Sequence, residues 1–196
     1  MELRNTTLAL LSGTALLFAA SDAAAVPGGD GAQKGVPPEA LLEVLPRRLW
    51  VSGAVTHPLH VEHLHSLGAR AIISLMTSQD EAMRGLHTGN RMGELLTAVA
   101  QFDMQREVHP LPEEPTLTQL QQIATRIELH IENGRPVALH CSAGQVRSPT
   151  AAAHYLVQAR GYSAEQVKRI DARFAGLPPR VFARIATPAH SAPSTR

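Results

Sequence analysis

The stretch PVALHCSAGQVRSPTAAAHYL, residues 136–156, indicates the fold. It opens with a short apolar segment, residues 136–140, that is typical of a buried β-strand. A loop starting at Cys141 follows, and an alanine-rich segment over residues 149–159 then favours a helix. Strands separated by helices form mostly parallel sheets, whose ligands bind beyond the carboxyl ends of the strands. The loop at Cys141 is therefore the first place to look for function.

The rest of the chain repeats this alternation of strand and helix. Apolar runs predict strands over residues 49–53, 71–76, 104–109 and 136–140. Helical periodicity predicts helices over residues 58–67, 91–101, 116–132, 149–159 and 163–174, with a last turn at 181–185, while residues 77–90 favour a loop. Thr116 with Gln119, and Ser163 with Gln166, can form capping boxes at two of these helices. The pattern predicts an α/β fold, a single domain with a mostly parallel central sheet flanked by helices.

Composition narrows the function classes. The chain has 196 residues, which suits one domain, and its 18 basic and 17 acidic residues leave a formal net charge of +1. A nucleic-acid partner is not expected, because such proteins carry a basic patch or a strongly basic charge. The single cysteine excludes a disulfide within the chain and a cysteine-based zinc cage.

The two ends of the chain differ from its middle. Residues 1–25 resemble a secretory signal peptide, with an apolar run followed by the small residues at 23–25, so we expect cleavage after about Ala25 and a periplasmic or secreted protein. The alternative is an uncleaved anchor, but the apolar run is shorter than the roughly 20 residues that span a bilayer. We expect a flexible leader over residues 26–39, the folded domain over 40–186 and a disordered tail over 187–196. No membrane contact is expected after cleavage.

The loop after the strand at 136–140 carries residue types that suit an anion site. A tight strand-to-helix loop turns its backbone N–H groups inward, and the helix N-terminus adds partial positive charge. Gly144 allows the bend, Arg147 can hold two anion oxygens, and the same field stabilises a thiolate at Cys141. Ser148 can hydrogen-bond that sulfur, and Pro149 suits a first helical position. The predicted anion-binding residues are Ser142, Ala143, Gly144, Gln145, Val146 and Arg147. The alternative reading is a buried structural cysteine beside a surface arginine.

The segment HCSAGQVRSPT resembles the signature loop of the cysteine-dependent tyrosine and dual-specificity phosphatases, His-Cys-x-x-Gly-x-x-Arg-Ser/Thr. The similarity extends over about residues 46–175 and is greatest to small exported bacterial enzymes. It implies that Cys141 attacks phosphorus to form a phosphocysteine, which water then hydrolyses. It also implies that Arg147 and the loop amides hold the phosphate, with no metal or cofactor. Val146 departs from the small residue that the family usually has before the arginine.

The family also uses a general acid, normally Asp, on the loop before the long helix. Here that loop, residues 109–115, contains no Asp. Glu113 matches the family position best and Glu114 comes next. Asp103 is a weaker candidate because it precedes a strand, and Asp80 and Glu81 lie on another loop that could face the site.

The resemblance implies a protein phosphatase that hydrolyses phosphotyrosine monoesters, and leaves phosphoserine and phosphothreonine open. The substrate would be a phosphorylated protein or a small phosphomonoester. The alternatives are a non-catalytic phosphate-binding module, for which the missing Asp argues, and an enzyme for small-molecule or inositol phosphates. Histidines at 57, 60, 63 and 65 include a pair one turn apart, but no carboxylate or cysteine completes a metal site, so we expect a solvated helix face.

Overall fold

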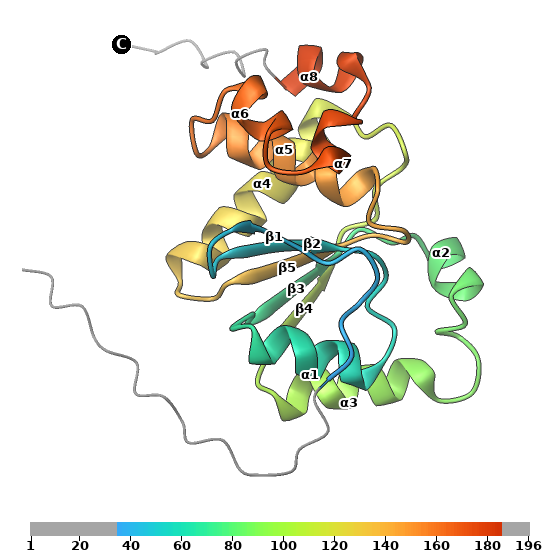
Figure 1. Cartoon of the computed structure of the whole chain (residues 1–196). Helices are drawn as coiled ribbons and strands as arrows, with labels where there is room; N and C mark the ends of the chain where they lie inside the picture. The colour runs from blue at the N-terminus through green and yellow to red at the C-terminus, as the bar shows by residue number, and fades with distance from the viewer. Residues whose placement is uncertain (1–34, 186–196) are drawn as a thin grey trace, which may run out of the picture. The chain divides into compact units, whose positions relative to one another are not determined.

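A computed structural model describes residues 35–185 (Figure 1). The predicted signal peptide, most of the predicted leader and the predicted tail lie outside these residues. Five strands form one sheet: β1 Leu42–Leu45, β2 Leu49–Ser52, β3 Ala71–Ser74, β4 Gln105–Val108 and β5 Val137–His140. The helices are α1 Pro58–Ser66, α2 Ser78–Met83, α3 Arg91–Gln101, α4 Leu117–Glu132, α5 Arg147–Gln158, α6 Ala164–Lys168, α7 Ala172–Ala175 and α8 Pro179–Ile185.

The sheet has the order β1-β2-β5-β3-β4. Only the β1–β2 pair is antiparallel, and β5 lies between β2 and β3 with both pairings parallel. Helices α4 to α8 lie on one face, and α1 and α3 lie on the other (Figure 1). The predicted fold class, a single α/β domain with a mostly parallel sheet flanked by helices, is confirmed.

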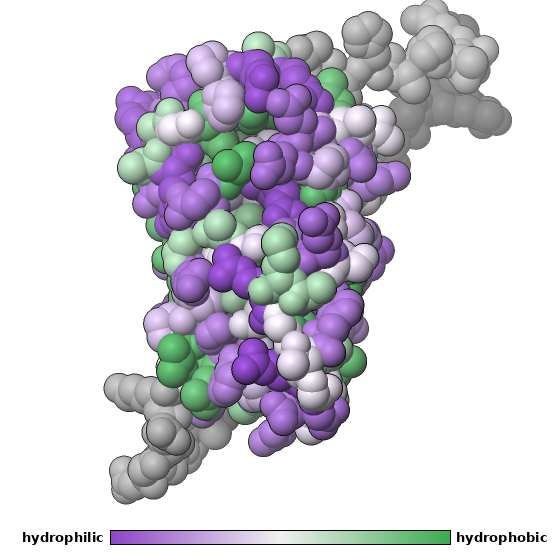
Figure 2. All heavy atoms as spheres, turned by 90° about the vertical axis from the view of Figure 1, so that its right-hand side faces the viewer, coloured by the Kyte–Doolittle hydropathy of each residue, from purple (hydrophilic) through white to green (hydrophobic). Residues whose placement is uncertain are grey.

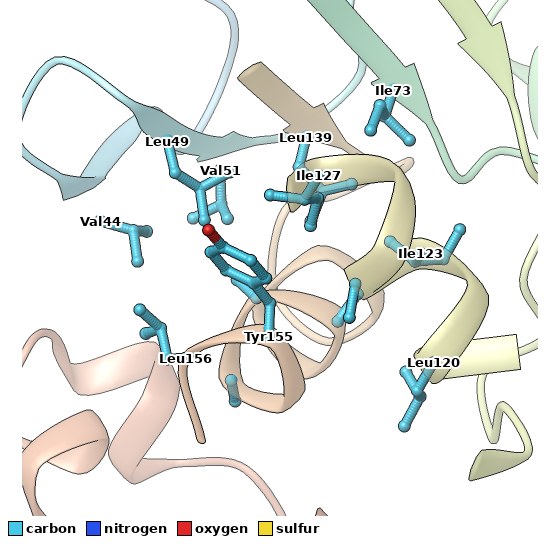
Figure 3. Close-up of a cluster of buried hydrophobic side chains, with 14 of the residues drawn as sticks. Val44, Leu49, Val51, Ile73, Leu120, Ile123, Ile127, Leu139, Tyr155 and Leu156 are labelled. Atoms are coloured by element: carbon cyan, nitrogen blue, oxygen red, sulfur yellow. The ribbon is translucent and has the colours of Figure 1, made fainter. Parts of the chain in front are cut away.

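Burial explains why the central strands were recognisable. All four residues of β2, β3 and β5 are buried, as expected for strands covered on both faces. The edge strand β4 is only partly covered, and its polar sequence QREV fits that place. The larger core lies between the sheet and α4 and α5. In Figure 3, Tyr155 of α5 lies among Leu49 and Val51 of β2 and Ile127 of α4.

The long helix α4 shows how local sequence determines one element. Thr116 accepts a hydrogen bond from the Gln119 amide while the Gln119 side chain accepts from the Thr116 amide, which is the predicted capping box. Its buried side chains recur on one stripe and include Leu120, Ile123 and Ile127. Burying each such side chain contributes roughly 1.5–3 kcal/mol. Packing on the sheet, with the cap, therefore holds the helix in place.

Four sequence predictions were wrong in detail. Residues 77–90 are not all loop, because Thr77 and Asp80 form a capping box that starts α2. The segment 163–174 is two helices, because the Asp171 side chain caps a second one by accepting from the Arg173 amide. Helix α5 begins at Arg147, so Pro149 is its third residue and not its first.

Strand β1 is the fourth difference. It was not predicted, because its four residues follow a segment rich in Gly and Pro and its burial comes from pairing with β2. The end of the predicted leader also contacts the domain. Gly53 N donates to Glu39 O at 2.7 Å, and Gly35 O lies 3.2 Å from His63 Nδ1.

No helix within residues 35–185 combines the length and apolarity needed to cross a membrane.

Candidate active site

The site lies where the parallel strands end. Ser52 of β2 and Ser74 of β3 both pair with His140 of β5, and Ser74 pairs with Val108 of β4. The chain segments that follow these four strands therefore meet at one edge of the sheet. They contain the loop at Cys141, helix α2, and residues 109–115, which we call the acid loop. Figure 2 shows the face on which α2 lies, and this face is mostly hydrophilic with small apolar patches.

Cys141 is held at the carboxyl end of the central strand. Its exposed fraction is 2%, and its backbone N–H donates to Ser52 O at 3.3 Å. Gly144 N donates to Cys141 Sγ at 3.3 Å, so one amide of the loop already points at the sulfur. Ser148 Oγ lies 3.4 Å from Sγ and 3.1 Å from Ser52 O, and its one proton can serve either acceptor. The loop thus brings an amide and a hydroxyl to the sulfur, as predicted.

Position 144 requires glycine because of its backbone conformation and because a Cβ there would collide with neighbouring atoms. Its φ of +71° lies in the left-handed region, and a Cβ at this position would lie 2.5 Å from Gly53 N and 2.7 Å from Ser52 C. Those neighbours are backbone atoms of the last residue of β2 and of the residue after it, and they cannot move without disturbing the strand. Only glycine lets the loop at Cys141 fold this closely against β2.

Arg147 is fixed by a carboxylate from another part of the chain. Its Nη1 and Nη2 donate to Asp80 Oδ2 and Oδ1 at 2.7 and 2.9 Å, and Nη1 also lies 3.3 Å from Leu111 O. The Arg147 and Asp80 side chains are only 12% and 10% exposed. The hydrogen bonds from Arg147 hold the pKa of Asp80 well below its usual range, and Asp80 raises the pKa of Arg147 in turn. Asp80 takes one N–H of each terminal nitrogen, and the second N–H of Nη1 faces Leu75 O and Leu111 O, which leaves the Nε–H and one N–H of Nη2 for an anion.

Helix α2 holds the loop at a second point. Arg84 Nη2 donates to Ser142 O at 2.6 Å, and its Nε donates to Ser142 Oγ at 3.2 Å. Arg84 Nη1 also reaches Glu39, at 3.5 Å. Asp80 and Arg84 are four residues apart, so one face of α2 contacts both ends of the loop. Sequence reasoning gave Asp80 only as a possible acid and missed Arg84, because nothing local links residues near 80 to residues near 140.

The histidine before the cysteine is buried and neutral. Burial lowers the pKa of His140 to about 3, and its Nδ1 accepts from Val55 N at 3.4 Å. His140 therefore joins the end of β5 to the segment after β2 as an uncharged side chain.

The carboxylates considered as general acids differ in the structure in whether an ion pair already holds them. Glu113 is exposed on the acid loop, and its charge is one of the smaller contributions that raise the pKa of Arg147. Glu114 is paired with Arg180 at 2.5 Å, and Glu81 is paired with Arg106 at 2.9 Å.

Asp103 lies far from this edge in the topology. It precedes β4, whereas the loop at Cys141 follows the parallel strand β5, so the two are at opposite edges of the sheet. Among residues 35–185, Glu113 is the acidic side chain near Arg147 that forms no ion pair.

Three of the four histidines at positions 57, 60, 63 and 65 contact the backbone through the ring Nδ1. His60 Nδ1 accepts from Thr56 N at 3.2 Å, and His57 Nδ1 accepts from Leu59 N at 3.1 Å. Among the described residues, no group of three or more His, Cys, Asp or Glu side chains is arranged to hold a metal ion.

Comparison with known proteins agrees with this geometry. A family model described as "Polymorphic toxin system, DSP-PTPase phosphatase" matches residues 48–161, more than half of the chain and the whole of the cysteine loop. The chain belongs to this phosphatase family. No curated protein matches the sequence.

Solved structures show the same fold at low sequence identity. A kinase-associated phosphatase whose catalytic cysteine is replaced by serine has a TM-score of 0.57 at 18% identity, covering 70% of this chain and 83% of its own. TpbA of P. aeruginosa has a TM-score of 0.54 at 17% identity, covering 74% and 82%. PTPMT1 in complex with PI(5)P has a TM-score of 0.57 at 17% identity, covering 71% and 88%.

Proposed function

We propose that the protein hydrolyses phosphotyrosine monoesters through a phosphocysteine intermediate. The observation that carries this proposal is the pairing of Gly144 N with Cys141 Sγ, beside an Arg147 guanidinium that Asp80 holds in place. A sulfur at the end of a central strand that receives an amide hydrogen bond, in a loop whose arginine is held by Asp80, supports attack on a phosphate ester and not packing alone.

Each step balances with the residues present. Cys141 Sγ forms a bond to phosphorus as the phosphorus–oxygen bond of the substrate breaks, and Glu113 protonates the departing oxygen. Arg147 and the amides of residues 142–147 hold the phosphoryl oxygens throughout. The Glu113 carboxylate then takes a proton from water, whose oxygen attacks phosphorus, and the thiolate of Cys141 leaves. Ser148 donates its hydrogen bond to the sulfur as that negative charge returns.

Turnover of p-nitrophenyl phosphate and of a phosphotyrosine peptide tests the proposal. We expect orthovanadate to inhibit both reactions and Cys141→Ser to abolish them. A protein that binds phosphate but never turns over either substrate would be the non-catalytic binding module instead. A phosphoserine peptide assayed in parallel decides whether the specificity is dual.

The role of Glu113 has its own test, with Glu114 as the matched control. Glu113→Gln should slow alkyl or phenyl phosphates more than p-nitrophenyl phosphate, because a poor leaving group depends more on protonation. Glu114→Gln should not show this leaving-group dependence, since Arg180 holds that carboxylate. Equal effects of the two substitutions would remove Glu113 from the mechanism.

A phosphatase for inositol phosphates is the second candidate, and Arg84 favours it. Its guanidinium lies on Ser142 at the outer end of the loop and adds a second positive charge near the phosphate. If this candidate is correct, inositol phosphates will be turned over faster than phosphotyrosine peptides. Arg84→Gln will then slow the inositol phosphates more than it slows phenyl phosphate.

We also propose that the protein is exported, with the signal peptide removed after about Ala25 and the folded domain spanning residues 40–186. The support is the sequence pattern of residues 1–25. Mass spectrometry of protein recovered from the periplasm or the medium tests it. A mature chain that still begins at Met1 would contradict cleavage.

A further inference from the structure

A cavity of about 220 Å³ lies between the acid loop, the start of α5 and the C-terminal helix α8. Much of its lining is apolar and comes from two helices, α4 and α8, and the cysteine loop: Leu120, Val146, Val181 and Ile185. The proposed hydrolysis of phosphotyrosine uses none of these side chains. Of the residues that line the cavity, only Glu113 has a side-chain role in the proposed hydrolysis, so its apolar part has no role yet assigned.

The cavity is continuous with the candidate active site. Glu113 lies on its rim, and Val146, which directly precedes Arg147, lines it. Val146 is 43% exposed, so a group bound in the cavity can reach its side chain. A substrate whose phosphate lies in the cysteine loop and whose leaving oxygen meets Glu113 extends past both residues. The part of the substrate next to the phosphorylated group thus meets this cavity.

Helix α8 is fastened to the acid loop and gives the cavity a defined wall. Arg184 Nη2 donates to Pro115 O at 2.5 Å, and Arg180 Nη2 pairs with Glu114 Oε1 at 2.5 Å. The Arg184 contact is partly buried, whereas the Arg180–Glu114 pair is exposed and contributes less. Because the wall is anchored to the loop that carries Glu113, a group bound in the cavity also fixes the distance between the substrate and the acid.

We propose that this cavity binds one apolar side chain that flanks the phosphotyrosine of a peptide substrate. The inference rests on the proposed function and adds the substrate feature that the enzyme recognises. The volume sets the size of the group, since an apolar cavity of about 150 Å³ already accommodates benzene. One Leu or Phe side chain fits, while a lipid acyl chain would need a much longer channel.

The test uses a set of phosphotyrosine peptides that carry Ala at every flanking position, and variants with one Leu or Phe at a single position. We expect one position at which Leu or Phe raises kcat/KM about tenfold over Ala, because burying such a side chain is worth about one factor of ten or more. Val181→Asp places a charge in the cavity and should abolish this preference. Leu129→Asp, at a 41% exposed site on α4 outside the cavity, is the matched control and should retain it.

Two further measurements keep the test decisive if a variant folds poorly. Val181→Trp fills the cavity without adding charge and should remove the same preference. Affinities of the peptides for Cys141→Ser protein should show the preference without turnover. Equal kcat/KM at all positions, or a preference that survives both Val181 substitutions, would overturn the inference.

The remaining outcomes separate this inference from the proposed function. If the protein hydrolyses phenyl phosphate but shows no preference for a flanking Leu or Phe, the inference about the cavity is wrong and the proposed function stands. A protein that hydrolyses neither phenyl phosphate nor any phosphotyrosine peptide loses the proposed function, and the inference with it. Faster hydrolysis of a micellar acyl-chain phosphate than of any peptide, with the advantage lost in Val181→Asp, would assign the cavity to a lipid and overturn the peptide proposal.

Discussion

Replacing Asp80 by Asn removes the charge that holds Arg147 while keeping the size of the side chain. The substitution breaks two charge-assisted hydrogen bonds, at 2.7 and 2.9 Å, between side chains that are about nine-tenths buried. Removing one partner of a buried pair typically costs about 3–5 kcal/mol. Asn retains one oxygen as an acceptor, so we expect the free energy of unfolding to fall by about 3 kcal/mol at pH 7.

Activity should fall further than stability suggests. Without Asp80, only the neutral acceptors Leu75 O and Leu111 O would hold the guanidinium of Arg147, so its position would be less well fixed. A displacement of about 1 Å at a catalytic site can cost about a hundredfold in rate. We therefore expect kcat/KM for phenyl phosphate to fall by about a hundredfold in Asp80→Asn, at a temperature where the variant is fully folded.

Thr77→Val provides the control, because it removes the hydroxyl that caps α2 and donates to Asp80 Oδ2 but leaves the charge of Asp80 in place. Loss of such a cap costs about 1 kcal/mol, and Arg147 keeps its carboxylate. Urea denaturation measures the stability of each variant, and initial rates with phenyl phosphate measure activity. If Asp80→Asn kept the wild-type rate at reduced stability, Asp80 would be a structural residue and the reasoning about Arg147 would be wrong.

The same pair predicts how stability depends on pH. The pKa of Asp80 in the folded protein is well below its ordinary value of 3.8, so the stabilisation is fully present above that value and is lost as pH falls below it. The stability difference between wild type and Asp80→Asn should be constant from about pH 5 upward and should shrink in acid. A difference that grows as pH falls would contradict the ion pair.

Three other predictions follow from contacts around the site. Arg184→Met removes the hydrogen bond to the Pro115 carbonyl and should lower kcat for phenyl phosphate several-fold more than kcat for p-nitrophenyl phosphate. Arg184→Lys should restore part of this loss. Equal losses for the two substrates would indicate a purely structural contact. Gly144→Ala should abolish vanadate binding, measured by titration, because its Cβ would collide with Gly53 N, and retained binding would contradict the packing. The Arg126 guanidinium lowers the pKa of Glu107 to about 2, so Glu107 should stabilise the fold above about pH 4.5 and lose that effect between about pH 4.5 and 2. The free energy of unfolding of Glu107→Gln, measured with urea, should therefore decline less in acid than that of wild type.

Local patterns in the sequence were sufficient for the centre of the fold and for the loop at Cys141. The continuous apolar runs of β3 and β5 and the capped stripe of α4 each depend on neighbours within a few residues. The spacing from Cys141 to Arg147 is likewise local. These features could be read without knowing which strands pair.

The features that were missed depend on partners distant in the sequence. Strand β1 is a strand because it pairs with β2, and α2 is held against the loop by contacts to residues 67 and 58 positions away, Arg147 and Ser142. The anchoring of the acid loop by Arg184 spans 69 positions. No periodicity in the chain encodes such distances, so sequence reasoning placed Asp80 near the site but could not assign its partner.

The place of β5 in the sheet has a consequence for how the molecule matures. This strand is the last of the five in sequence yet lies in the middle, between the β1–β2 hairpin and the β3–β4 pair. Until it inserts, the two halves share no edge, and closing that gap requires pairings across long stretches of chain, which form slowly. A nascent or truncated polypeptide that lacks β5 therefore also lacks the strand end that positions the loop at Cys141, and this loop takes up its arrangement only when the whole domain has assembled.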